Sequence, residues 1–373
     1  MLLLDTITLM KVGIVGLPNV GKSTVFNSLT RAGAEAQNYP FTTINPNLGV
    51  VVVPDGRLHA LAAVMSSKRA VPATVDFVDV AGLVRGASAG EGLGNQFLAH
   101  IRECDAVAHV VRCFEDDNVV HVHGAVDPVD DVEIINTELL LADLATVERR
   151  LERVSRAAKS SDPKLKDEAV ELERLRDHLS GGDPARGFAS GSEELEELLR
   201  KLITAKPTLY VANVDEESVA TGNRYSAEVE KLAAGEGTEA VKLSAMLEAD
   251  VAELPEDEAR EYLGMYGVES TGFDGFVRAA YRLLGLITFF TATEKEARAW
   301  TLRERSTARR AGSTPTWSAA LSRRRWATGR TSWPRGPGRG PASRRRCASM
   351  AATQVAAMMR SFVARRSYAY AWK

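Results

Sequence analysis

The stretch GLPNVGKS, residues 16–23, decides the fold class of this chain. It has the form G-x-x-x-x-G-K-[ST], which marks a phosphate-binding loop where it joins a strand to a helix. The apolar run Val12–Val15 comes before it as a predicted strand, and Ser23–Thr30 follows it with a helical pattern. The sequence therefore predicts an α/β fold with a doubly wound, mostly parallel sheet, and a nucleotide site where the first strand ends.

This loop has the residue types that hold a polyphosphate. Gly16 and Gly21 let the backbone bend around the anion, and the amide groups and dipole at the start of a helix attract negative charge. Lys22 is expected to reach the β and γ phosphates, and the Ser23 hydroxyl to ligate Mg²⁺. The alternative, an ordinary glycine turn followed by a chance Lys-Ser pair, is disfavoured by the flanking strand and helix.

A second apolar stretch, Ala73–Asp79, predicts a buried strand that runs into the motif D-x-x-G, whose last residue is Gly82. An aspartate at the carboxyl end of such a strand lies beside the phosphate loop, where Asp79 can hold Mg²⁺ through water while the Gly82 amide senses the γ phosphate. Alone, D-x-x-G is more often a simple turn. Downstream of a phosphate loop, it indicates a nucleotide switch.

The polar, proline-bracketed segment NYPFTTINP, residues 38–46, lies between these two motifs, in the position of a first switch loop. A threonine there can complete the metal shell when triphosphate is bound and leave it on hydrolysis. We select Thr43 rather than Thr42 for this role. By spacing alone, a solvated loop whose threonines have no function remains an open alternative.

Two later elements have the order of base-binding loops. The strand Thr208–Ala212 leads into NVDE, residues 213–216, where guanine-specific proteins carry N-K-x-D with an aspartate that accepts hydrogen bonds from guanine. Because Glu216 is longer than aspartate, guanine selectivity should be lost or weakened, and Asn213 is available for an adenine amine. After the strand Ala240–Leu243, the segment SAM, residues 244–246, is expected to cover the other side of the base.

The chain resembles the YchF/Obg-like ATPase family, translation-associated P-loop proteins of the GTPase superfamily that generally prefer ATP. The resemblance extends from Lys11 to about Leu302. It rests on GLPNVGKST, NYPFTTINPN, FVDVAGLVRGASAGEGLGNQFLAHIRECDA, HVVRCFEDDNVVHV, NTELLLADL, NVDE and LITFFTATEKEARAW. It implies a cytoplasmic hydrolase of ATP, or of GTP, with Mg²⁺ as cofactor. It also implies the ribosome as partner, through the large subunit, with RNA contact.

Together, the motifs and the resemblance define a set of expected site residues. The expected nucleotide contacts are Gly16, Asn19, Val20, Gly21, Lys22, Ser23, Thr24, Gly82, Asn213, Val214, Glu216, Ser244, Ala245 and Met246. The expected metal site consists of Ser23 and Thr43, with Asp79 acting through water.

The catalytic residues are less well defined by the sequence. Leu83 follows Gly82 at the position where a Ras-like enzyme carries a glutamine that orients the attacking water, so basal turnover should be slow. The resemblance places a candidate catalytic histidine at His121, and an imidazole can orient or deprotonate water. A surface histidine just beyond a strand is the alternative. Lys22 is the second expected catalytic residue.

Composition agrees with a globular chain of two or three domains. The chain has 373 residues, of which 45% are hydrophobic, enough to build a core. No apolar run approaches the roughly eighteen residues that span a bilayer, so no membrane contact is expected. The three cysteines, Cys104, Cys113 and Cys347, are too few and too scattered for a disulfide framework or a zinc site. A reducing cytoplasm is therefore expected.

The chain divides by pattern into five parts. The nucleotide domain is expected at 10–129 and 202–284, interrupted at 130–201 by a coiled-coil helical hairpin with a turn at Asp162-Pro163. Such a charged hairpin is either an arm that contacts a large partner or a solvated helical pair. An incomplete TGS-like domain is expected to start at 285–302. Residues 303–373 form a basic tail.

The tail differs sharply in charge from the rest of the chain. Residues 301–373 contain sixteen Arg and one Lys against one acid, Glu304, whereas residues 1–300 carry 30 basic and 48 acidic residues. The tail has too few large aliphatic residues to fold. It is either a basic nucleic-acid-binding arm or the frame-shifted end of a GC-rich gene. The abrupt loss of resemblance favours the frame shift, which resequencing of the 3′ end tests.

The predicted function is a slow, Mg²⁺-dependent nucleotide hydrolase that prefers ATP and binds the ribosome differently in its two nucleotide states. One alternative is a GTPase or an enzyme of dual specificity. Another, from a different class, is a nucleotide-gated ribosome- or RNA-binding module that does not hydrolyse, which Leu83 would favour.

Overall fold

The computed structural model describes residues 10–35, 47–80, 93–119, 124–158, 163–303 and 368–371. The chain forms two compact units. The first contains the described parts of residues 1–54 and 73–286, and the second those of residues 55–72 and 287–373. None of the described helices combines the length and the apolar character needed to cross a membrane.

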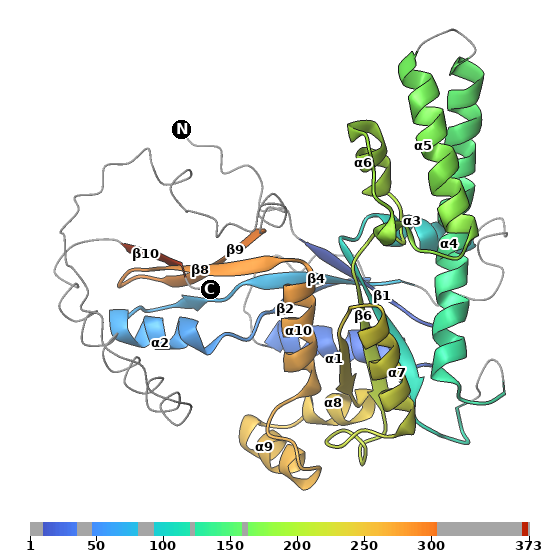
Figure 1. Cartoon of the computed structure of the whole chain (residues 1–373). Coiled ribbons are helices and arrows are strands. Elements are labelled where there is room, and N and C mark those ends of the chain that lie inside the picture. The colour runs from blue at the N-terminus through green and yellow to red at the C-terminus, as the bar shows by residue number, and fades with distance from the viewer. Residues whose placement is uncertain are drawn as a thin grey trace, which may run out of the picture. The chain divides into compact units, whose positions relative to one another are not determined.

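A six-stranded sheet forms the centre of the first unit (Figure 1). Its strands, in spatial order, are β2 (Leu48–Val52), β4 (Thr74–Asp79), β1 (Lys11–Val15), β5 (Ala106–Cys113), β6 (Thr208–Val214) and β7 (Ala240–Leu243). All neighbouring strands are parallel except β2, which runs antiparallel to β4. The predicted α/β fold with a mostly parallel sheet is therefore confirmed.

The central strands are apolar because both faces of the sheet are covered. Every residue of β5 is buried, as is typical of a parallel strand between two layers of helices. Tyr210 of β6 and Cys113 of β5 pack on one face with residues of α4 and α7. On the opposite face, Phe77 of β4 contacts Phe276 of α10, with 5.2 Å between ring centroids.

The first unit has helices that cover the sheet and helices that extend away from it. They are α1 (Lys22–Glu35), α3 (Leu93–Arg102), α4 (Pro128–Ala157), α5 (Pro163–Ser180), α6 (Glu193–Leu199), α7 (Arg224–Gly235), α8 (Ala245–Val251), α9 (Glu256–Met265) and α10 (Gly272–Leu283), with the short 3₁₀ helix η2 at Ala185–Gly187.

Helices α4 and α5 run side by side as a hairpin (Figure 1). Asp127 caps the start of α4 through the amides of Val129 and Asp130, and Pro128 occupies its first turn. The first half of α4 packs on the sheet, whereas its second half packs with α5 around an apolar seam. This seam includes Val147, Val154, Leu172, Leu175 and Leu179.

The root of the hairpin is bonded to the rest of the first unit. The buried Asp143 carboxylate of α4 accepts hydrogen bonds from the amides of Ile203 and Thr204, at 2.9 and 2.7 Å. Arg102, at the end of α3, donates to the Thr146 hydroxyl at 3.3 Å. Helix α4 is thus fixed near its middle, both to the segment before β6 and to α3.

The second unit contains α2 (Gly56–Met65) and a sheet with the strand order β10 (Tyr368–Ala371), β8 (Leu286–Ala292), β9 (Ala297–Arg303) and β3 (Ala70–Val71). The predicted boundaries placed residues 55–72 in the nucleotide domain, whereas β3 pairs with β9, which joins these residues to the second unit. Most of the basic tail lies outside the described residues, but Tyr368–Ala371 pairs with β8.

Candidate nucleotide site

The phosphate loop joins β1 to α1 and has the backbone that its sequence requires. Gly21 has a φ of 87° and Asn19 a φ of 65°, in the left-handed region that favours glycine and tolerates asparagine. A Cβ atom on Gly16 would lie 2.6 Å from the Val110 carbonyl oxygen, and one on Gly21 would lie 2.3 Å from Asn213 Nδ2. Both glycines are therefore needed for close packing as well as for bending.

Lys22 and Asp79 come together at the carboxyl ends of neighbouring parallel strands. Ile14 of β1 is in register with Asp79 at the end of β4, which brings the carboxylate to the start of α1. The Lys22 ammonium forms an ion pair with Asp79, and Lys22 is only 7% exposed. The structure thus places the expected phosphate ligand beside the expected metal-shell carboxylate.

The donors at this position suit Mg²⁺ held mainly by phosphate oxygens and water. Ser23, the second residue of α1, is exposed, so its hydroxyl is accessible, and Asp79 is paired with the preceding residue, Lys22. Within the described parts of the chain, no three His, Cys, Asp or Glu side chains converge into a dedicated metal cage. Mg²⁺ keeps several waters and commonly takes one or two protein ligands plus substrate phosphates, which fits this sparse donor set.

Asn213, at the end of β6, connects the phosphate loop to the base-side loop. Its Nδ2 donates to the Val20 carbonyl oxygen at 2.9 Å, and its Oδ1 accepts from the Ala245 amide at 2.9 Å. The side chain is only 3% exposed. Each amide atom already has a partner within the protein, so Asn213 acts as a tether between the two loops. Its expected contact with an adenine amine stays a prediction.

The remaining base-side residues differ in what they can present to a ligand. Val214 is 2% exposed and packs into the core, which leaves only its backbone for contact. Ser244 is buried and caps α8 by accepting from the Leu247 amide at 3.4 Å. Met246 is 59% exposed and presents an apolar surface. Glu216 is half-buried, and among the described residues its carboxylate has no ion-pair partner.

Arg112 is a structural residue that the sequence analysis missed. It is 2% exposed at the end of the apolar strand β5. Its guanidinium donates to the carbonyl oxygens of Phe114, Asp116 and Val119 at 3.1, 3.2 and 2.9 Å. It therefore fixes the segment that follows β5. A lone arginine in an otherwise apolar strand was the signal that could have revealed it.

Four expected residues fall outside the described parts of the chain: Thr43, Gly82, Leu83 and His121. Thr43 as a metal ligand, Gly82 as the γ-phosphate sensor and His121 as the catalytic histidine stay predictions. The slow turnover expected from Leu83 in the glutamine position also stays a prediction.

Comparison with known proteins gives the family. A ribosome-binding ATPase YchF from Bacillus subtilis (strain 168) is 50% identical over 296 residues, which is 78% of this chain and 81% of that protein. A protein of the same name from Escherichia coli O157:H7 is 52% identical over 294 residues, 78% of this chain and 80% of the relative. This chain belongs to the YchF family.

Two further comparisons agree with this YchF assignment. A family model described as "50S ribosome-binding GTPase" matches residues 11–142. The solved structure of the Schizosaccharomyces pombe YchF GTPase has a TM-score of 0.69 and 36% identity, and the match covers 79% of this chain and 81% of that one. The resemblance stated from the motifs is therefore confirmed at the level of family and fold.

Proposed function

We propose that this YchF-family chain is a Mg²⁺-dependent nucleotide hydrolase that prefers ATP and binds the ribosome in the cytoplasm according to its nucleotide state. The observation that carries the proposal is the convergence of Lys22 and Asp79 beside the phosphate loop, with Asn213 joining that loop to the base-side segment. This is the arrangement that a site for a nucleoside triphosphate needs at one edge of a parallel sheet.

The chain's own residues have distinct parts in this mechanism. Amides of the loop from Gly16 to Thr24 bind the phosphates, and Lys22 adds a positive charge that moves from Asp79 to the β and γ oxygens when a triphosphate binds. Ser23 and Thr43 would hold Mg²⁺ directly, and Asp79 would hold it through water. When bound, the cation would neutralise charge on the transferring phosphoryl group.

Preference for ATP is proposed from the base-side loop. Val214 replaces the lysine of N-K-x-D, and Glu216 replaces its aspartate, so the carboxylate that reads guanine is displaced by one methylene. Met246 offers an exposed apolar surface on which either purine can rest. Competition between ATP and GTP for the purified chain tests this, and a tenfold preference for GTP, about 1.4 kcal/mol, would reverse it.

Hydrolysis is proposed to be slow because Leu83 stands in place of a water-orienting glutamine. We expect basal turnover below the intrinsic Ras rate of about 10⁻⁴ per second. His121 is our candidate for the group that orients water. This role is lost if His121→Ala leaves basal and stimulated hydrolysis unchanged.

Single-turnover release of phosphate from ATP separates an enzyme from a nucleotide-gated binding module that does not hydrolyse. That rival function is favoured by Leu83. We expect slow but complete release in the presence of Mg²⁺ and its loss in Lys22→Ala. Lys201→Ala is the matched control, because Lys201 is exposed and its ion pair within the described part of the chain is with Glu197 one turn away.

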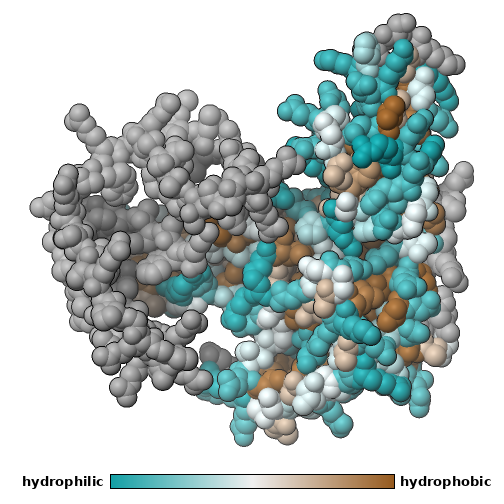
Figure 2. Space-filling model, viewed as in Figure 1, coloured by the Kyte–Doolittle hydropathy of each residue, from teal (hydrophilic) through white to brown (hydrophobic). Residues whose placement is uncertain are grey.

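The proposed partner is the ribosome, with the large subunit as the contacting part and RNA contact included. Support comes from the names of the relatives and from the matching family model. The α4–α5 hairpin, whose face shown in Figure 2 is mostly hydrophilic, is our candidate contact arm. Co-sedimentation with separated subunits, in ATP and in ADP, tests this. Equal binding in both nucleotides would contradict the switch.

We keep the boundaries at 130–201 for the hairpin and at 285–302 for the start of the TGS-like region as proposals, with the nucleotide domain on either side of the hairpin.

A further inference from the structure

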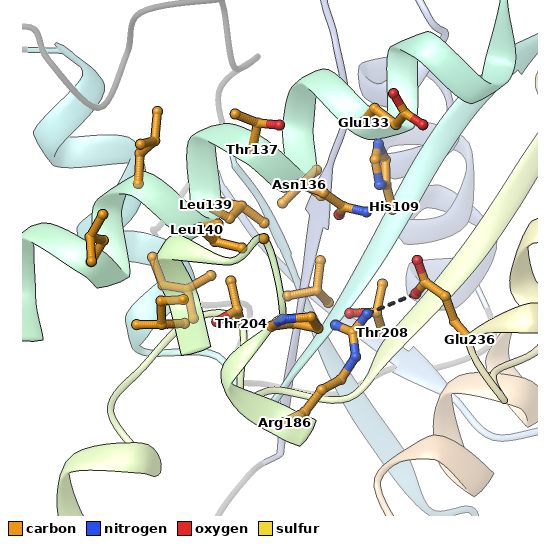
Figure 3. A pocket seen from close by; sticks show the side chains of 18 of the residues that line it. His109, Glu133, Asn136, Thr137, Leu139, Leu140, Arg186, Thr204, Thr208 and Glu236 are labelled. Atoms are coloured by element: carbon orange, nitrogen blue, oxygen red, sulfur yellow. Dashed lines mark hydrogen bonds and ion pairs between the residues drawn. The ribbon is translucent and has the colours of Figure 1, made fainter. Parts of the chain in front are cut away.

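A cavity of about 500 Å³ lies in the first unit between α4 and the sheet (Figure 3). Strands β5 and β6 form its floor, and α4, the end of α5, the η2 segment and the end of α7 surround it. None of the expected nucleotide contacts lines it. Its volume lies within the range of pockets that bind small molecules.

The cavity has an apolar part and a polar part. Leu139, Leu140 and Leu144 of α4 and Leu179 of α5 supply the apolar wall. His109 of β5 and Asn136 of α4 lie together in its polar part (Figure 3). A lining of this kind binds a mainly apolar molecule and orients it through a small number of polar contacts.

His109 is a polar group of this cavity that can accept a hydrogen bond from a ligand. Its side chain lines the cavity and is only 2% exposed. Its ring packs against Tyr210, with 5.6 Å between centroids, and among the described residues neither ring nitrogen has a hydrogen-bond partner. Burial lowers the pKa of His109 to about 3, so the imidazole is neutral and one nitrogen is an acceptor. Because His109 lines the cavity, this acceptor is available to a hydrogen-bond donor on a ligand.

The charges around the cavity disfavour anions. The guanidinium of Arg186 is bonded to the Glu236 carboxylate at 2.7 Å, and the Tyr210 hydroxyl donates to the same carboxylate at 3.1 Å. No other lysine or arginine among the described residues lines the cavity, whereas the exposed Glu133 adds a negative charge. A phosphate or carboxylate would therefore find no uncompensated cation here.

We propose that this cavity binds a small uncharged molecule with an apolar ring system and a hydrogen-bond donor directed at His109. Such a molecule would contact α4 and strands β5 and β6 at once, so its binding would strengthen the attachment of the helical hairpin to the sheet. The proposal concerns a second site and does not depend on nucleotide hydrolysis.

Two related dyes test the chemistry of the site in the full-length protein. N-phenyl-1-naphthylamine is neutral, with two aromatic parts and one N–H donor, and 8-anilino-1-naphthalenesulfonate is its sulfonated anion. We expect saturable fluorescence enhancement with one neutral dye per chain, and at least about tenfold weaker binding of the anion. Saturation with Mg²⁺ and ATP should leave dye binding unchanged.

Variants then locate the dye. His109→Phe keeps a ring but removes the acceptor and should weaken binding of the neutral dye about tenfold, the upper range for one hydrogen bond. Leu140→Trp fills the cavity and should abolish binding. Thr137→Trp, at an exposed position of the cavity wall, should do the same with less risk to folding. Val170→Trp, at an exposed site on α5 outside the cavity, is the control and should bind normally.

Unchanged binding in folded Thr137→Trp and Leu140→Trp proteins would overturn the proposal. The proposal would also be overturned by equal affinity of the protein for the two dyes or by displacement of the neutral dye by ATP. Non-saturating binding of several molecules of the neutral dye per chain would overturn it as well. Thermal melting of each variant establishes that it is folded before its binding is scored.

Discussion

Replacing Asn213 by alanine is expected to loosen the phosphate loop and the base-side loop together. The side chain is buried and makes one hydrogen bond to each loop, both of 2.9 Å. Its removal leaves the Val20 carbonyl oxygen and the Ala245 amide without these bonds. Because an unsatisfied buried group costs about 1–3 kcal/mol, the two losses sum to roughly 2–4 kcal/mol if water partly replaces them.

This cost is divided between folding and nucleotide binding. We expect urea unfolding to show Asn213→Ala destabilised by at least about 1 kcal/mol, and calorimetry to show ATP affinity reduced by at least about tenfold. Asn213→Asp refines the test, because it keeps an acceptor for Ala245 but places a carboxylate oxygen against the Val20 carbonyl. Asn213→Asp should lower both the stability in urea and the affinity for ATP at least as much as Asn213→Ala does.

Asn118→Ala is the matched control, since Asn118 is exposed and, among the residues that the structure describes, its hydrogen bonds go to the nearby Asp116. It should change stability by less than about 0.5 kcal/mol. If Asn213→Ala behaves like this control in both measurements, the tether does not hold the two loops, and the reasoning is refuted.

Three other perturbations have defined outcomes. Gly21→Ala should prevent ATP binding in calorimetry, because alanine is strained at a φ of 87° and its Cβ would overlap Asn213; wild-type affinity would contradict this. Burial raises the pKa of Glu248 to about 7, so between about pH 4.5 and 7 the folded state keeps a proton that the unfolded state has released. The free energy of unfolding should therefore decrease by up to about 3 kcal/mol as the pH rises from 4.5 to 7. Urea titrations of Glu248→Gln should not show this decrease. Arg112→Met should lower stability by about 2–4 kcal/mol in urea unfolding, because three carbonyl oxygens lose their donor; Arg156→Met, at an exposed site paired with Glu152 one turn away, should not.

The sequence was sufficient for the parts of the site that lie on consecutive motifs. The strand, loop and helix around residues 16–23 follow from local pattern. The approach of Asp79 to Lys22 follows from the rule that carboxyl ends of parallel strands meet at one edge. The side-chain direction of Val214 was also available in principle, because Tyr210, Ala212 and Val214 alternate into one core cluster.

Contacts between distant segments could not be read from the sequence. The two bonds of Asn213 depend on the packing of β6 against a loop almost two hundred positions earlier in the chain. The pairing of Ala70–Val71 with β9 joins segments that no periodicity connects. The cavity over His109 arises only when α4, the η2 segment and the sheet assemble. In each case tertiary geometry, rather than local preference, determines the outcome.

Helix α4 is one continuous rod of 30 residues, about 45 Å long, with one half on the sheet and the other in the hairpin. Because it is fixed at Asp143 and is bonded at Thr146 to the end of α3, a small rotation about this point is amplified toward its far end. A tilt of about ten degrees about Asp143 displaces Ala157, roughly 21 Å further along the helix, by about 4 Å. Through the bond between Arg102 and Thr146, a displacement of α3 would be transmitted to the outer half of the hairpin.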